Sequence, residues 1–223
     1  MKPRPPLLPM VLAILAVLCF TAAYAAWVAR PPRPAFHGTA YDPAPAPAFR
    51  LADVEGRPVT LDSYRGTPVL IFFGYTKCAD FCPLTLDRLS RTVHDLGRRA
   101  GGARIVFVSV DPANDTPPIL RDYAARFGGN VTALTGDSAA LAQAWKGYGV
   151  YALPEPEKKP SAAAAHGDHG HHANAPASSA RTPQLMHSGV VYGIDRAGNL
   201  RVIITEGAPV ESMRDDIRTL ARL

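Results

Sequence analysis

Apolar residues occur along this chain in continuous runs that alternate with segments of helical spacing. The runs at 69–73 and 105–110 are typical of strands buried on both faces of a sheet. A shorter run at 131–134 predicts a third strand. After the first run, four apolar residues recur at the spacing of an amphipathic helix: Leu86, Leu89, Val93 and Leu96. This alternation predicts an α/β domain in which helices flank a mixed central sheet.

Turn-forming residues between short apolar segments predict two hairpins. The paired segments are 49–51 with 59–61, and 190–194 with 200–204. Thr116, which precedes Pro117 and Pro118, is suited to begin another helix. Two further helices are predicted at about 138–146 and 210–220.

The N-terminal segment 7–28 carries no charged residue and follows a short basic stretch with Lys2 and Arg4. Its length is close to the roughly 20 residues of a spanning helix. We therefore expect residues 1–28 to be a single-pass anchor in the inner (cytoplasmic) membrane, with the rest of the chain on the periplasmic side. The alternative is a cleaved signal peptide, because Ala23-Tyr24-Ala25 has the small-x-small form of a cleavage site.

Two segments rich in Pro and Ala lack any apolar period and delimit the domain. Residues 29–48 predict an extended tether between the anchor and the domain. The folded domain is then expected over 49–223, interrupted by an insertion at about 154–183. We expect the insertion to be disordered without metal, because so long a segment without periodicity is unusual in a compact domain.

The net charge of the chain is weakly positive. Lys and Arg number 24 against 19 Asp and Glu, which gives +5. From Ala29 onward the balance is 22 basic against 19 acidic residues, or +3. So small an excess does not make the basic footprint of a nucleic-acid-binding protein, and no nucleic-acid partner is expected.

Two cysteines separated by three residues, Cys78 and Cys82, lie between the first buried strand and the helix that Pro83 opens. This spacing lets both sulfurs face one point. The positive end of the helix dipole favours the thiolate, so thiols of low pKa are expected. The pair fits a structural disulfide, a redox couple or a soft-metal site, and its place between strand and helix argues against the first.

Three motifs follow one another along the chain. They are PVLIFFGYTKCADFCP at 68–83, VSVDPANDTP at 108–117, and His187-Ser188 ahead of Tyr192. Together they resemble the SCO/SenC family, which comprises membrane-anchored, thioredoxin-like proteins that deliver copper to the CuA centre of cytochrome c oxidase. The resemblance covers about residues 49–222 and implies a thioredoxin-like fold.

The resemblance also implies a ligand set. Cys78, Cys82 and His187 would be the copper ligands, and Asp111 would be a supporting residue near them. Soft Cu(I) prefers thiolates, and an added imidazole accommodates Cu(II), so the set suits copper in either oxidation state. Zinc also takes these ligands with a water, so the residue types alone leave it open.

Two classes of function remain open. In the first, the protein is a metallochaperone rather than an enzyme and passes copper to the CuA-bearing oxidase subunit. In the second, it is an exported thiol-disulfide oxidoreductase that keeps oxidase cysteines reduced, and Cys78 and Cys82 are catalytic. A periplasmic copper donor or thiol reductant is a further expected partner. The three-residue spacing, and the absence of a proline directly before Val190, favour metal binding.

Four histidines cluster within the insertion: His166, His169, His171 and His172. They are interpreted as auxiliary metal ligands of low affinity or, alternatively, as polar residues of a solvated linker. Their nearness in sequence to His187 favours the metal interpretation.

Overall fold

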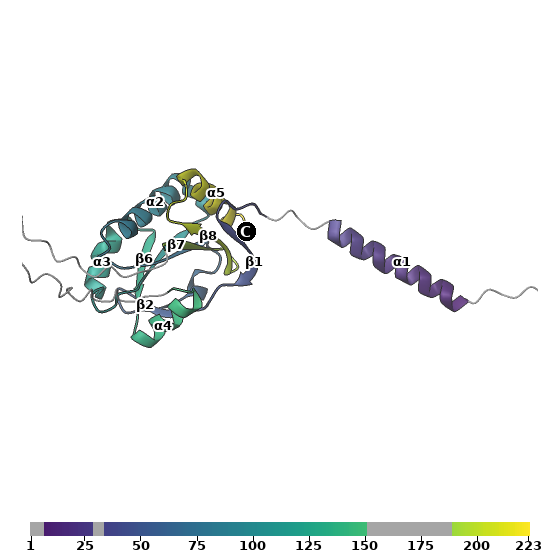
Figure 1. Ribbon diagram of the computed structural model, residues 1–223, viewed down its shortest axis with the longest axis horizontal. Helices are drawn as coiled ribbons and strands as arrows, with labels where there is room; N and C mark the ends of the chain where they lie inside the picture. Colours follow the sequence, from purple (N-terminus) through teal and green to yellow (C-terminus); the bar gives the residue numbers. More distant parts are fainter. Residues whose placement is uncertain (1–6, 29–33, 151–188) are drawn as a thin grey trace, which may run out of the picture. The chain divides into compact units, whose positions relative to one another are not determined.

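A mixed sheet forms the centre of the domain (Figure 1). The computed structural model describes residues 7–28, 34–150 and 189–223. Within these ranges the strands are β1 (Thr39–Pro45), β2 (Arg50–Asp53), β3 (Pro58–Thr60), β4 (Val69–Gly74), β5 (Arg104–Ser109), β6 (Val131–Thr135), β7 (Val190–Ile194) and β8 (Asn199–Thr205). Their order in the sheet is β1-β8-β7-β4-β5-β6-β2-β3. The predicted mixed sheet is confirmed.

Helices cover both faces of this sheet. They are α2 (Phe81–Leu96), α3 (Pro117–Ala125), α4 (Ser138–Gly147) and α5 (Val210–Leu220), with the short 3-10 helices η1 (Leu61–Tyr64) and η2 (Gly97–Ala100). In Figure 1, α2 and α5 lie side by side along one face, and α4 lies on the other. The described core falls between Ala46 and Leu220, so residues 35–223 form a unit with its own core.

The central strand β4 is buried along its whole length, as its continuous apolar run predicts. It runs parallel to β5, from the pair Val69 with Arg104 to the pair Gly74 with Ser109, and antiparallel to β7. Alternate side chains anchor it on both faces. The Phe72 ring packs on Phe107, with centroids 6.2 Å apart, and the Phe73 ring packs on Tyr148 at 5.3 Å. Packing on both faces of the sheet therefore fixes the carboxyl end of β4.

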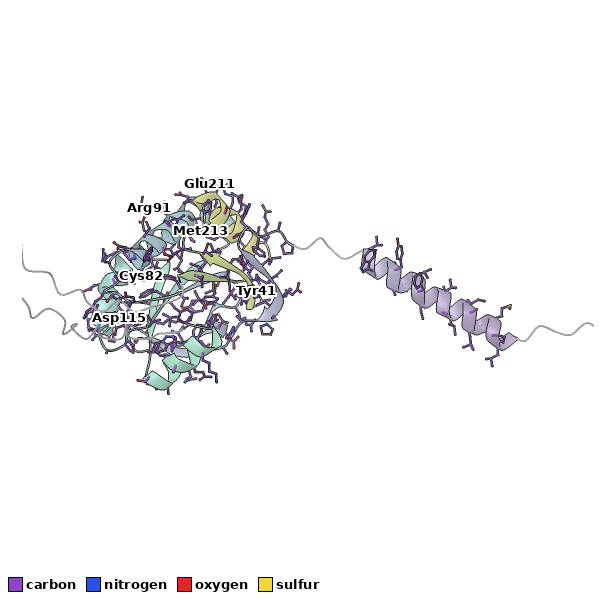
Figure 2. The ribbon with its side chains drawn as sticks, viewed as in Figure 1. Tyr41, Cys82, Arg91, Asp115, Glu211 and Met213 are labelled. Carbon is purple, nitrogen blue, oxygen red and sulfur yellow. The ribbon has the colours of Figure 1, made fainter. Side chains whose placement is uncertain are left out.

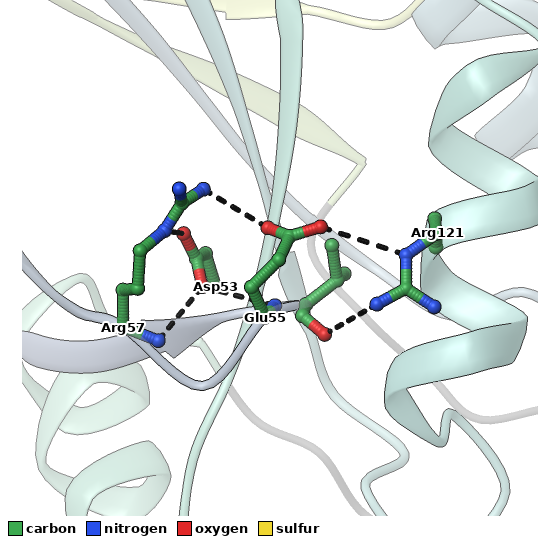
Figure 3. A network of polar contacts seen from close by, with 5 residues as sticks. Asp53, Glu55, Arg57 and Arg121 are labelled. Carbon is green, nitrogen blue, oxygen red and sulfur yellow. Dashed lines mark hydrogen bonds and ion pairs between the residues drawn. The ribbon is translucent and has the colours of Figure 1, made fainter.

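A polar network joins the predicted hairpin of β2 and β3 to α3 (Figure 3). The buried carboxylate of Asp53 accepts hydrogen bonds from the backbone N–H and Nε of Arg57, at 2.8 and 2.7 Å. Glu55 pairs with Arg57 at 3.0 Å and with Arg121 of α3 at 3.5 Å. These contacts hold the far edge of the sheet against α3.

Strand β1 corrects the predicted tether. Residues 29–48 were expected to be extended linker, but 39–45 pair antiparallel with β8. The folded unit begins at Ala35 rather than near Phe49. The apolar alternation that signals a strand is missing because every β1 residue is exposed, and an edge strand tolerates proline since one side of it forms no ladder.

A buried carboxylate fixes the chain just before β1. Asp216 of α5 is 1% exposed and accepts hydrogen bonds from the backbone N–H groups of His37, at 2.7 Å, and Gly38, at 3.0 Å. Gly38 is needed there, because a Cβ at this position would lie 2.6 Å from the carbonyl oxygen of Ile203. The entry of the chain into the domain is thus fastened to α5.

The N-terminal helix α1 (Leu7–Val28) belongs to a separate unit, residues 1–34. Its segment Leu8–Ala25 is the one stretch in the described parts of the chain that is long and apolar enough to cross a membrane. Length and composition are the whole basis of that finding, and a signal sequence near the N-terminus meets the same criteria. The anchor and the signal peptide both stay predictions.

Replacement of Asp216 by alanine is expected to destabilise the domain by about 1–3 kcal/mol, because two backbone donors lose their acceptor. The matched control is Asp215→Ala, which removes a partly exposed carboxylate paired with Arg218 at 2.7 Å. Such surface pairs contribute about 0–1 kcal/mol. Urea unfolding of residues 35–223 measures both losses, and equal losses would contradict the role given to Asp216.

Candidate metal centre

The two cysteines meet where β4 ends and α2 begins. Cys78 lies in the connecting loop and Cys82 in the first turn of α2. The backbone N–H of Cys82 donates to Cys78 Sγ at 3.3 Å. Both side chains are reduced, and they are 5% and 0% exposed. A pair of thiols in contact, shielded from water, is therefore present at the carboxyl end of the central strand.

Local sequence explains this arrangement. Pro83 occupies the third position of α2, where its missing N–H would have had no partner in the helix. The neighbouring N–H of Cys82 is one of the free donors of the first turn, and Cys78 Sγ accepts it. Gly74 leaves room for the sulfur, since a Cβ there would lie 2.9 Å from Cys82 Sγ. Glycine, proline and the spacing of the cysteines thus act together.

The predicted low pKa is wrong for Cys82. Its side-chain hydrogen bond with Cys78 and its burial raise the pKa of the Cys82 thiol well above the ordinary value. The helix dipole was the basis of the prediction, but its effect is smaller than that of burial in an apolar environment. Cys82 is therefore held as the neutral thiol in the metal-free protein.

A buried carboxylate holds the cysteine loop in place. Asp115, in the loop between β5 and α3, is 1% exposed and accepts hydrogen bonds from the backbone N–H of Thr76 at 3.1 Å and from its hydroxyl at 2.5 Å. The hydroxyl of Ser109 donates to its other oxygen at 2.7 Å. Burial raises the pKa of Asp115, while the hydrogen bonds from Thr76 and Ser109 partly oppose that rise. Figure 2 shows Asp115 and Cys82 on the same side of the domain.

Asp111, the predicted supporting residue, lies at the periphery of this loop. Its two carboxylate oxygens accept hydrogen bonds from the side-chain amide of Asn114, at 3.0 and 2.8 Å. Asn114 in turn accepts from Lys77 Nζ at 2.6 Å, next to Cys78. The direct link to the cysteine loop is made by Asp115, which lies in the same sequence motif. Nothing in the pattern of the sequence distinguishes the buried Asp115 from the half-buried Asp111.

A buried tyrosine hydroxyl also lies near the two cysteines. Tyr123 of α3 is 5% exposed, and within the described part of the chain its hydroxyl has no hydrogen-bond partner. Its ring packs on Phe107, with centroids 5.4 Å apart. Burial, together with Cys82 and Cys78, raises the pKa of Tyr123. The hydroxyl therefore stays protonated and keeps a donor in the apolar surroundings of the thiols.

The described residues supply two of the predicted ligands. His187 and the four clustered histidines, His166, His169, His171 and His172, lie outside the described residues. Among the residues that are described, no group of three His, Cys, Asp or Glu side chains is placed to hold a metal ion. A complete metal site at Cys78 and Cys82 thus requires a ligand from elsewhere in the chain or from a partner.

Comparison with protein families gives a match to the model described as SCO1/SenC over residues 38–174. Cys78, Cys82 and Asp111 lie inside the matched range, and His187 lies beyond it. Among curated proteins, the mitochondrial protein SCO2 of Saccharomyces cerevisiae is 33% identical over 114 residues, which is 51% of this chain and 38% of that protein. The SCO2-like protein RP587 of Rickettsia prowazekii is 37% identical over 89 residues, 40% of this chain and 43% of that protein. The chain thus spans about two fifths of these relatives.

Solved structures extend the likeness to the whole domain. Bradyrhizobium japonicum ScoI, solved with copper bound, is 30% identical with a TM-score of 0.61 and covers 78% of this chain and 98% of its own. Yeast Sco1, also solved with copper bound, is 27% identical with a TM-score of 0.62, over 78% of this chain and 87% of its own. The predicted thioredoxin-like fold, with its mixed sheet and flanking helices, is confirmed.

Removal of the Asp115 carboxylate is expected to loosen the cysteine loop. In Asp115→Ala the Thr76 and Ser109 donors lose their shared acceptor, at about 1–3 kcal/mol, so local opening becomes about 5- to 150-fold more frequent. The labelling rate of the two buried thiols by a thiol reagent in the native state reports that opening. Asp111→Ala, which removes contacts to Asn114 alone, is the matched control, with an expected change below about twofold. Similar rates in the two variants would contradict the assignment.

Proposed function

The chain belongs to the SCO1/SenC family, and on that premise we propose that it binds copper and delivers it to the CuA centre of cytochrome c oxidase. Cys78 and Cys82 are the proposed thiolate ligands, and His187 is the proposed third ligand on the strength of the motif resemblance. The four histidines of the insertion are proposed auxiliary ligands. The observation that carries the proposal is the pair of buried, reduced thiols in contact at the end of β4.

The chemistry of the pair suits a soft cation. Thiolates select Cu(I) over hard cations, and the two negative charges of the deprotonated thiols attract the cation. Since Cys82 is protonated in the metal-free protein, copper binding must release a proton, and the affinity must rise with pH. Two solved relatives, both described as copper-bound, support the choice of metal.

A thiol-disulfide oxidoreductase is the second candidate function. The side-chain hydrogen bond between the two cysteines favours it, because it brings together the two sulfurs that a disulfide would join. The raised pKa of Cys82 limits its role to the resolving thiol, so Cys78 would have to attack a partner disulfide. Disulfide formation also removes both copper ligands, so oxidation would switch copper binding off.

We also propose that α1 anchors the chain in the inner membrane and that the domain faces the periplasm. The uncharged helix of 22 residues supports the anchor. The CuA-bearing oxidase subunit, and a copper donor or thiol reductant in the same compartment, are then the partners within reach.

The reduced domain, residues 35–223, is expected to bind one Cu(I) per chain in an anaerobic titration. Cys78→Ser and Cys82→Ser should abolish the tight site, and His187→Ala should weaken it at least about tenfold, the effect of losing one contact worth roughly 1.4 kcal/mol. His94→Ala is the control, because the His94 side chain is 87% exposed on α2. Unchanged affinity in Cys78→Ser and His187→Ala would overturn the ligand assignment.

Cells that lack the protein should lose cytochrome c oxidase activity, and added copper should restore it, because excess copper bypasses a delivery step. The readout is oxidase turnover in isolated membranes with and without copper in the growth medium. Restoration by an added thiol reductant, with no response to copper, would instead support the oxidoreductase. The Cys78→Ser variant serves as the control that expresses the chain without its proposed site.

A further inference from the structure

Arginines gather around a pocket at the opposite end of the sheet from the cysteines. The pocket has a volume of about 530 Å³ and is lined by Gly101, Ala221 and five arginines: Arg98, Arg99, Arg196, Arg218 and Arg222. No acidic residue lines it. We call this feature the arginine pocket. Its concentration of charge contrasts with the weak excess of the chain as a whole.

Most of this charge is not neutralised by neighbouring side chains. Arg218 pairs with Asp215 at 2.7 Å, and Arg196 donates to the carbonyl oxygen of Gly101 at 3.4 Å. Within the described part of the chain, Arg98, Arg99 and Arg222 have no ion-pair partner. Arg218 is therefore the one lining arginine with an ion pair to a carboxylate among the described residues. The carbonyl ends of η2 and α5 attract such cations, but a helix terminus carries only about half an elementary charge.

The chemistry of the lining selects phosphate-type anions. Guanidinium is a planar fork that binds phosphate oxygens through two parallel hydrogen bonds, and it is charged at every physiological pH. Several guanidinium groups around one open cavity suit a ligand that carries a phosphate together with further polar atoms. The headgroup of an anionic phospholipid has that composition.

The chain enters the domain beside α5, the helix that carries part of the arginine pocket. Asp216 binds the backbone of His37 and Gly38, and it lies on the same helix, α5, as Arg218. Five residues, 29–33, separate α1 from Pro34, and five residues reach at most about 18 Å. A membrane that holds α1 is therefore joined to the domain through a short linker.

We propose that the arginine pocket binds the phosphate groups of anionic phospholipids in the membrane that holds α1. The inference relies on the proposed anchor and is independent of copper binding. Under this proposal, lipid binding and copper binding take place at opposite ends of the sheet. Lipid would bind at the arginine end, and the cysteine end lies about 20 Å away along the six residues of β4.

Vesicle binding by residues 35–223 tests the proposal, since this unit has its own core and lacks α1, Arg30 and Arg33. Vesicles of phosphatidylglycerol mixed with phosphatidylcholine are expected to bind the domain, and vesicles of phosphatidylcholine alone are not. Each arginine near an anionic surface contributes about fivefold, so Arg99→Gln with Arg222→Gln should lower the partition coefficient about 20- to 30-fold. Equal binding to both kinds of vesicle overturns the proposal.

A charge-matched control distinguishes binding by the arginine pocket from general attraction of a positively charged protein to an anionic surface. Arg50→Gln with Arg91→Gln removes two exposed arginines outside the pocket and should change binding less than about threefold. Equal losses in the two double variants would overturn the pocket as the lipid site. Thermal stabilisation by inorganic phosphate, without any binding to anionic vesicles, would identify a site for free anions and would also overturn the lipid assignment. Unchanged melting temperatures in the variants show that the fold is retained.

Discussion

The carboxylate of Asp115 is buried where it cannot be hydrated, and the geometry of the cysteine loop depends on it. A buried charge is stable only when donors surround it, and here the donors come from Thr76 and Ser109. Thr76 precedes Cys78 by two residues, so each hydrogen bond that satisfies Asp115 also fixes the start of the loop. The loop cannot relax without leaving the charge unpaired, and this constrains the position of Cys78.

Rigidity from below comes from β4. Phe72 and Phe73 point to opposite faces and pack against aromatic rings on each, so the strand cannot shift toward either layer. Gly74 then ends the strand at a point where only a hydrogen atom fits beside Cys82 Sγ. Two thiols held in this way lose little conformational entropy when they bind a metal or join in a disulfide. The hydrogen bond with Cys78 and the burial of the pair also raise the pKa of Cys82, so its reactivity depends on a partner that displaces the proton.

Sequence alone identified the elements whose burial leaves a pattern. The runs at 69–73 and 105–110 became β4 and β5, and the helix predicted at 210–220 has those bounds in α5. Strand β1 was missed because all its residues face solvent, so no alternation marks it. Both cysteines were found by their spacing, whereas the importance of Asp115 depends on its burial, which no local pattern encodes. The low thiol pKa was predicted from the helix terminus alone, and for Cys82 the hydrogen bond with Cys78 and burial, both properties of the folded environment, raise the pKa instead.

The separation of the thiols from the arginine pocket has an electrostatic consequence. Five guanidinium groups beside the cysteines would favour the thiolates but would repel an incoming copper cation. At about 20 Å, more than twice the screening length of roughly 8 Å at physiological ionic strength, their field at the thiols is largely screened. The environment of Cys82 is then governed by its contact with Cys78 and its burial, which are local. Charge can accumulate at one end of the sheet without changing the metal chemistry available at the other, because β4 holds the two ends apart.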